Sequence, residues 1–226
     1  MPAPTNNDLL EPALGSMLVV GGTIEGYVHG IEHSQIDNSP AHGMVLHWAS
    51  QVPEGTITGS LWRERGLAER FMANVLADTI TEVVATDRER DRTSPDFSYS
   101  MLSIVGFVAG ADADLAIGRK VGGADGAVLV RPRADRGRIE YLAIAKSLGL
   151  EDAAPPGMIA HVAASEGDEV RWIDLWLDRA APAAFYEEGG IASESLELLP
   201  LHTVFVNAEE LKQLPRFPRG ENHLHF

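Results

Sequence analysis

The chain has 226 residues, with 33 acidic against 18 basic side chains and a formal net charge of −15. Nucleic acids and anionic membranes attract clustered Lys and Arg, so this charge argues against both as partners. The absence of cysteine excludes disulfides, thiolate metal ligands and a thiol nucleophile. We expect a cytoplasmic protein, because the N-terminus lacks a signal pattern and no apolar run approaches the roughly 20 residues of a membrane span.

The first half of the chain alternates strand-like and helix-like segments. Apolar runs between turn residues indicate strands, and apolar side chains three and four residues apart indicate helices. In chain order, these patterns predict a loose tail over 1–15, a strand over 17–24, a helix over 24–36, paired strands over 44–49 and 57–62, a helix over 65–85, a charged loop over 87–96 and a strand over 100–110.

The second half follows a linker over 111–126, rich in Gly and Ala, and repeats this order. Its first helix is predicted to be capped by Asp135 and stopped by Gly149. Pro182 is acceptable in the first turn of its second helix. The full prediction is a strand over 127–134, a helix over 136–148, paired strands over 157–164 and 170–177, a helix over 180–188, a strand over 196–206 and a last helical turn over 208–214.

The two halves are weak copies of each other at a constant offset of 114 residues. Nine of the 45 positions from residue 27 to residue 71 are identical to their counterparts. The matched pairs are Tyr27 and Tyr141, Gly43 and Gly157, Met44 and Met158, His47 and His161, Ala49 and Ala163, Leu61 and Leu175, Trp62 and Trp176, Arg65 and Arg179, and Phe71 and Phe185. A repeat of this size indicates two copies of one supersecondary unit that pack on each other.

Each copy has the order strand–helix–strand–strand–helix–strand, which is typical of a ferredoxin-like unit. Helices cover one face of such a sheet, and the other apolar face needs a partner. The predicted fold is therefore α+β, with two tandem ferredoxin-like units that form an internal pseudo-dimeric α/β barrel. The expected divisions are a flexible N-terminal tail 1–15, unit 1 over 16–110, a linker 111–126, unit 2 over 127–207 and a C-terminal tail 208–226.

The second copy carries a motif of wider occurrence. It reads PPGMIAHVAASEGDEVRWIDLWLDRAAPAAFYEE and is followed by LPLHTVFV. This pattern resembles the dimeric α/β-barrel superfamily of the antibiotic-biosynthesis-monooxygenase type. The resemblance implies a tailoring oxygenase that acts on a polycyclic aromatic, polyketide-like substrate in an apolar pocket lined by Trp. It also implies no tightly bound cofactor. Oxygen then reacts either with the substrate directly or with a diffusible reduced flavin (FMN or FAD), for which a flavin reductase would be a partner.

Candidate site residues come from the matched positions and from the differences between copies. A neutral imidazole near pH 7 can take a proton from a phenol, and in relatives the Trp at this place lines the cavity. Asp174 alternates with Trp172 and Trp176, so the three side chains face one way. Asp174 and His202 are missing from the first copy, which favours one working cavity in unit 2. The predicted catalytic residues are His202, His161, Trp176 and Asp174, and the predicted substrate-binding residues are His47, Trp62, Tyr141 and Phe185.

Structural roles remain open for every one of these residues. The histidines can be core residues bonded to the backbone, the tryptophans and tyrosines can fill the core, and Asp174 can pair with a surface Arg. The corresponding function is a non-catalytic small-molecule-binding or structural protein. A third alternative is a cyclase or isomerase that uses the same base without oxygen. The protein is expected to be a monomer or a homodimer.

Other cofactor patterns are weaker. The segment from His29 to His33 reads H-x-x-E-H, an inverted zinc-protease pattern, but its counterpart in the second copy keeps none of it. We therefore predict no metal site, while binding of a metal ion by His29 and His33 stays open. A haem-degrading role is disfavoured, because the expected His on the second helix and Asn on the first strand are absent. Val121-Gly122-Gly123 lacks the spacing of a dinucleotide fingerprint.

Overall fold

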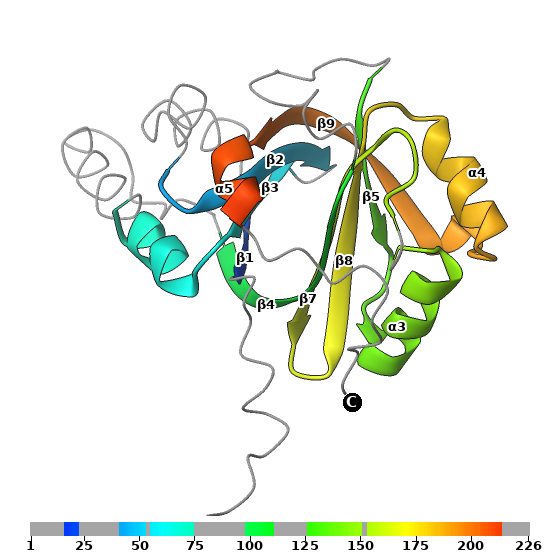
Figure 1. The fold of residues 1–226 in the computed structure, drawn as a ribbon, viewed down its shortest axis with the longest axis horizontal. Coiled ribbons are helices and arrows are strands. Elements are labelled where there is room, and N and C mark those ends of the chain that lie inside the picture. Colours follow the sequence, from blue (N-terminus) through cyan, green and yellow to red (C-terminus); the bar gives the residue numbers. More distant parts are fainter. Residues whose placement is uncertain are drawn as a thin grey trace, which may run out of the picture.

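The computed structural model describes residues 16–22, 41–52, 55–74, 98–110, 126–150 and 153–213 (Figure 1). These residues form a mixed α+β structure in which a single antiparallel sheet curls around an apolar interior. The following predicted parts lie outside the described residues: the first helix over 24–36, residues 75–85 of the second helix, the charged loop, most of the linker, the N-terminal tail and residues 214–226 of the C-terminal tail. His29, His33 and Val121-Gly122-Gly123 lie outside them as well.

The sheet contains nine strands in the described part of the chain. They are β1 (Ser16–Gly22), β2 (Met44–Val52), β3 (Gly55–Trp62), β4 (Ser98–Ala109), β5 (Val128–Pro132), β6 (Arg136–Gly137), β7 (Met158–Glu166), β8 (Glu169–Trp176) and β9 (Leu196–Val206). The helices are α3 (Arg138–Ser147), α4 (Ala181–Glu188), α5 (Ala208–Gln213), a short 3-10 helix (Ser193–Ser195) and a helical segment over 65–74.

The strand order brings the two ends of the sheet together. The order is β5-β9-β2-β3-β1-β4-β7-β8-β6, and every pairing is antiparallel. Strand β5 pairs with β8 as well as with β9, so the chain of pairings returns to its starting strand. Within the first half the order is β4-β1-β3-β2, and within the second half, apart from β6, it is β9-β5-β8-β7.

Two hairpins of the sheet have the same geometry. Strands β2 and β3 begin and end 114 residues before β7 and β8. The pairing register shifts between Met44 and Leu46 in the first hairpin and between Met158 and Ala160 in the second. Equivalent residues therefore follow the same path through an irregular feature, and the predicted paired strands are confirmed in both halves.

The contacts around these hairpins also repeat. Gly43 and Gly157 precede the two hairpins with φ values of 84° and 83°, a conformation that Gly adopts without a steric penalty. The Trp that ends each hairpin packs on a Phe of the following helix, with ring centroids 5.0 Å apart for Trp62 and Phe71 and 5.3 Å for the second pair. The turn before each hairpin and the helix after it are thus held in the same way.

The core is layered. The interior of the curled sheet is a cluster of buried apolar side chains from both halves, including Trp48, Leu102, Leu129, Ile159 and Val204. Separate clusters lie between the sheet and its helices. Helices α3 and α4 lie beside each other next to β5 and β8, and the segment 65–74 lies on the opposite side of the molecule (Figure 1).

Helix α5 is anchored to the first half by a buried carboxylate. Glu210 accepts a hydrogen bond from the backbone N–H of Gly43 at 2.9 Å. Its other oxygen lies 2.9 Å from Arg63 Nη1. The last described helix therefore holds the turn before β2 in place.

The predicted elements of the second half hold, with one correction. Strand β9 spans the predicted residues, α4 contains Pro182 in its first turn, and Gly149 follows α3 with φ of 67°. The prediction that Asp135 caps α3 is wrong, because the helix begins at Arg138 behind Gly137. Asp135 instead accepts two hydrogen bonds from Arg171, at 3.0 and 2.7 Å. The division into two tandem units stays a prediction. Within the described residues, no helix combines the length and apolar character that crossing a bilayer requires.

Candidate functional site

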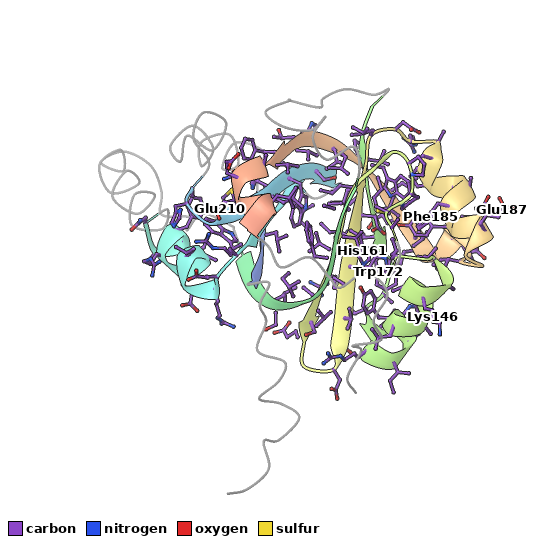
Figure 2. The ribbon with its side chains drawn as sticks, in the orientation of Figure 1. Lys146, His161, Trp172, Phe185, Glu187 and Glu210 are labelled. Carbon is purple, nitrogen blue, oxygen red and sulfur yellow. The ribbon has the colours of Figure 1, made fainter. Side chains whose placement is uncertain are left out.

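The polar centre of the second half lies between the sheet and its helices. Strand pairing places His161 of β7 opposite Asp174 of β8. His161 Nδ1 lies 2.6 Å from Asp174 Oδ1, and the two residues are only 2% and 0% exposed. Figure 2 shows His161 and Trp172 close together on the side of the sheet that carries α3 and α4. A buried charge is costly unless it is paired and hydrogen-bonded, so this pair needs specific surroundings.

Helix α3 supplies the second contact to His161. The hydroxyl of Tyr141 lies 2.9 Å from His161 Nε2, so both ring nitrogens have partners. A carboxylate can only accept, so we assign the proton of Nδ1 to the bond with Asp174. Nε2 is then the basic nitrogen, and Tyr141 donates its hydroxyl proton to it. Burial raises the pKa of Tyr141 well above its ordinary value, and the nearby Asp174 carboxylate raises it further.

A glycine on β4 makes room for this tyrosine. The pairing of β4 with β7 shifts register between Ile104 and Gly106. A Cβ atom added at Gly106 would lie 2.4 Å from the Tyr141 hydroxyl oxygen, which is closer than real Cβ contacts allow. The absence of a side chain at Gly106 therefore lets Tyr141 reach His161.

Helix α4 supplies a second tyrosine. The hydroxyl of Tyr186 donates a hydrogen bond to Asp174 Oδ2, so each carboxylate oxygen has a partner. Burial raises the pKa of Tyr186 well above its ordinary value, with a further contribution from the Asp174 charge. The four residues Tyr141, His161, Asp174 and Tyr186 form one continuous network, which we call the Tyr–His–Asp–Tyr network.

Aromatic rings enclose the network. The ring centroid of Tyr141 lies 5.8 Å from that of Trp172. Trp176 packs on Phe185 at 5.3 Å and on Tyr186 at 6.4 Å. Both tryptophans are at most 2% exposed. The polar groups are thus surrounded by low-dielectric material, in which their mutual interactions are stronger than in water.

The equivalent place in the first half carries no acidic group at the matched position. His47 of β2 pairs in register with Ser60, which stands where the second half has Asp174. The Ser60 hydroxyl accepts a hydrogen bond of 2.7 Å from Trp62 Nε1. Met72 stands 114 residues before Tyr186. At these matched positions, the second half alone combines a buried His with a carboxylate and a tyrosine.

The structure brings some of the predicted site residues together and separates others. His161, Asp174 and Tyr141 share the network, with Trp176 and Phe185 adjacent to it through Tyr186. His47 and Trp62 occupy the matching place of the first half. His202 lies on β9 with an exposed side chain, between the buried Leu201 and Thr203, so its assignment as a base stays a prediction.

Sequence reasoning missed Tyr186 and Gly106. Tyr186 follows the matched Phe185, but its first-half counterpart is Met72, so the repeat gave no reason to select it. Gly106 stands alone within an apolar strand pattern, and an isolated Gly in a strand is a signal for a bulge or a close approach that could have found it. Among the described residues, no group of three or more His, Asp or Glu is arranged to hold a metal ion.

Comparison with known proteins identifies the fold. No family model matches the sequence, and no curated protein matches it. A solved structure named "putative monooxygenase" from Lactobacillus acidophilus NCFM superposes with a TM-score of 0.53 at 13% identity, over 85% of this chain and 96% of that one. A second protein with that name, from Fusobacterium nucleatum subsp. nucleatum, gives 0.54 at 10% identity, over 87% and 96%.

An anthrone oxidase-like protein gives a TM-score of 0.41 at 16% identity, over 88% of this chain and 96% of that one. This TM-score is too low to establish a common fold with that protein. At the identities of the first two proteins, structural similarity indicates a common fold and leaves the activity to be argued from the site. The chain therefore shares its fold with two bacterial proteins named as monooxygenases.

Proposed function

We propose that this protein is a tailoring oxygenase that acts on a polycyclic aromatic substrate with an enolisable phenol or quinone group, and that His161 is its base. The observation that carries this proposal is the buried His161–Asp174 pair, with Tyr141 on the basic nitrogen. A base that is oriented by a carboxylate and kept from water is what proton abstraction from a phenol requires. The common fold with proteins named as monooxygenases supports the oxygenase chemistry.

In the proposed reaction, the substrate proton leaves through Tyr141. The Tyr141 hydroxyl gives its proton to His161 Nε2 while its oxygen accepts the proton of the substrate. Asp174 stabilises the imidazolium that forms, since its carboxylate lies 2.6 Å from Nδ1. The electron-rich substrate anion then reacts with oxygen directly; alternatively, a reduced flavin (FMN or FAD), supplied by a reductase as a cosubstrate, would activate the oxygen that attacks the substrate. The aromatic surroundings exclude water from the charged intermediate.

We further propose that the chain is a tandem duplication whose halves form one pseudo-dimeric barrel. The repeated hairpins with equivalent register shifts, the matched positive-φ glycines and the matched Trp–Phe contacts support this proposal. Loss of the carboxylate at Ser60 then leaves one working site for each chain, in the second half.

A non-catalytic role is the second candidate, and one observation favours it. Both ring nitrogens of His161 and both oxygens of Asp174 have partners inside the network. A fully satisfied buried network can serve only to specify the core. A cyclase or isomerase would use the same base without oxygen.

Oxygen uptake by the purified protein separates these candidates. The substrates are a panel of anthrones and hydroxyquinones, each with and without a flavin reductase, NADH and FMN or FAD. Uptake without flavin indicates a cofactor-free oxygenase, and uptake only with reduced flavin indicates a borrowed cofactor. Substrate turnover without oxygen uptake indicates a cyclase or isomerase, and ligand binding without turnover indicates a binding protein.

Three variants then test the base. His161→Ala is expected to lower turnover about 10²–10⁴-fold, the usual contribution of a general base. Lys146→Ala, on the exposed side of α3, is the control and should retain wild-type turnover. Circular dichroism verifies that each variant is folded. If His202→Ala abolishes turnover while folded His161→Ala retains it, the base is His202 and our assignment is wrong.

A further inference from the structure

The hydroxyl of Tyr141 is a phenol whose proton already points at a base. With Nδ1 of His161 bonded to Asp174, Nε2 accepts from Tyr141 at 2.9 Å. When a phenol loses one electron, its O–H becomes strongly acidic, and the radical is stabilised if the proton can move to a nearby base. Here the product would be an imidazolium, and the Asp174 carboxylate would stabilise its charge. The arrangement thus couples loss of an electron from Tyr141 to a short transfer of its proton.

Within the described part of the chain, the neighbouring side chains Trp172 and Tyr186 do not donate to an imidazole. The indole Nε1 of Trp172 is buried and has no hydrogen-bond partner among the described residues, so an oxidised Trp172 has no base to receive its proton. Tyr186 donates to Asp174, and a carboxylate is a weaker base than an imidazole. Of these three side chains, Tyr141 is the one whose hydroxyl contacts an imidazole nitrogen, which is why we place the electron vacancy there.

The surroundings would also protect a radical. Tyr141 is 4% exposed, and its ring packs against Trp172 at 5.8 Å. This burial shields the phenol oxygen from bulk solvent, while electrons can still move between rings in contact. The raised pKa of Tyr141 keeps the phenol protonated, so electron loss and proton transfer remain linked.

We propose that Tyr141 is a redox-active tyrosine that reduces oxygen-centred radicals of the peroxyl class. The Tyr141 phenol gives one electron to the peroxyl radical, which becomes a hydroperoxide anion, and gives its proton to His161 Nε2. The O–H bond of Tyr141 breaks, an N–H bond forms on His161, and a neutral tyrosyl radical remains. This inference rests on the proposed function, since oxygenase turnover would be the source of such radicals, but its test needs no turnover.

The test generates the radical in the full chain without substrate. A ruthenium(III) tris(bipyridine) oxidant is formed by a light flash in the presence of persulfate, the sample is frozen, and the radical is recorded by electron paramagnetic resonance. Protein with ¹⁵N-labelled histidine is then used for electron–nuclear double resonance. We expect a tyrosyl signal coupled to a histidine nitrogen, which identifies a phenol oxygen bonded to an imidazole. Absence of a histidine-coupled tyrosyl signal would overturn the proposal, even if no variant can be made.

Matched variants assign the signal. Tyr141→Phe and Tyr186→Phe each remove one buried hydroxyl from the same network, and near-ultraviolet circular dichroism verifies their packing. The nitrogen-coupled signal should vanish in Tyr141→Phe and persist in Tyr186→Phe. The opposite result would place the radical on Tyr186 and refute the inference. Because no turnover is measured, a negative result here leaves the oxygenase proposal as it stands.

Discussion

Replacement of Gly106 by Ala tests whether the Tyr141–His161 contact depends on an absent side chain. The new Cβ would lie 2.4 Å from the Tyr141 hydroxyl oxygen, and the next contacts are Ala163 Cβ at 3.4 Å and Tyr141 Cζ at 3.5 Å. Either the tyrosine or the strand must move. Overpacking of a core costs about 1–3 kcal/mol, and loss of the hydrogen bond to His161 adds about 1 kcal/mol. We expect Gly106→Ala to lower the free energy of unfolding by about 2–4 kcal/mol.

A double-mutant cycle isolates the hydroxyl as the cause. In a Tyr141→Phe background the clashing atom is gone and the remaining contacts are near ordinary van der Waals distances, so Gly106→Ala should cost less than about 1 kcal/mol. Urea unfolding followed by tryptophan fluorescence measures all four proteins. Gly66→Ala is the control, since the nearest atom to its new Cβ is Arg70 Nη1 at 3.8 Å; it should be neutral or stabilising by up to about 1 kcal/mol. An equal cost of Gly106→Ala in both backgrounds would refute this account of the site.

Three further predictions follow from single interactions. Arg171 lowers the pKa of the Asp135 carboxyl below 3.8, so the stabilisation is present above the unfolded-state pKa and is lost as pH falls through the folded-state pKa. In urea unfolding, Asp135→Asn should have a free energy of unfolding lower by up to about 1 kcal/mol near neutral pH, and this difference should shrink in strong acid. Because the pKa values of Tyr141 and Tyr186 are raised, their contribution is present below the ordinary pKa of 10.0 and lost as pH rises through the folded values. These two phenols should therefore ionise only when the protein unfolds in alkali, which an ultraviolet absorbance titration detects. In each Tyr→Phe variant, that late absorbance step should be smaller by one phenol. Gly43→Ala should destabilise the protein more than Gly157→Ala. Both glycines have positive φ, but only at Gly43 would the new Cβ lie 2.2 Å from a leucine side chain. Equal decreases in the free energy of unfolding, measured in urea, would contradict the role of this clash.

The sequence predicted the site as far as local geometry reaches. A hairpin places residues across from each other through its own short turn, so His161 and Asp174 were both found, 13 residues apart. Strand alternation also put Asp174 on one face with Trp172 and Trp176, and the structure buries all three. The same alternation explains His202. It lies between two buried residues of β9 and is therefore exposed, a fact that a comparison of the two copies could not reveal.

Asp135 shows where local rules give the wrong partner. An acidic residue just before a helical pattern is a good cap by sequence. In the folded chain, Arg171 of β8 presents two donors to it. A bidentate, charge-assisted pair is stronger than a single cap bond, so the tertiary contact determines its role.

The sequence by itself determined the matched hairpins, the helices that follow them and the absence of cysteine chemistry, because these depend on residue type and on neighbours a few positions away. Only the tertiary structure decided that Tyr141 and Tyr186 reach opposite ends of the His161–Asp174 pair, and that Gly106 leaves the space for this. Those contacts depend on how two helices dock on the sheet and on a register shift between β4 and β7. Docking is set by the summed packing of many side chains that are distant in sequence, which no local pattern records.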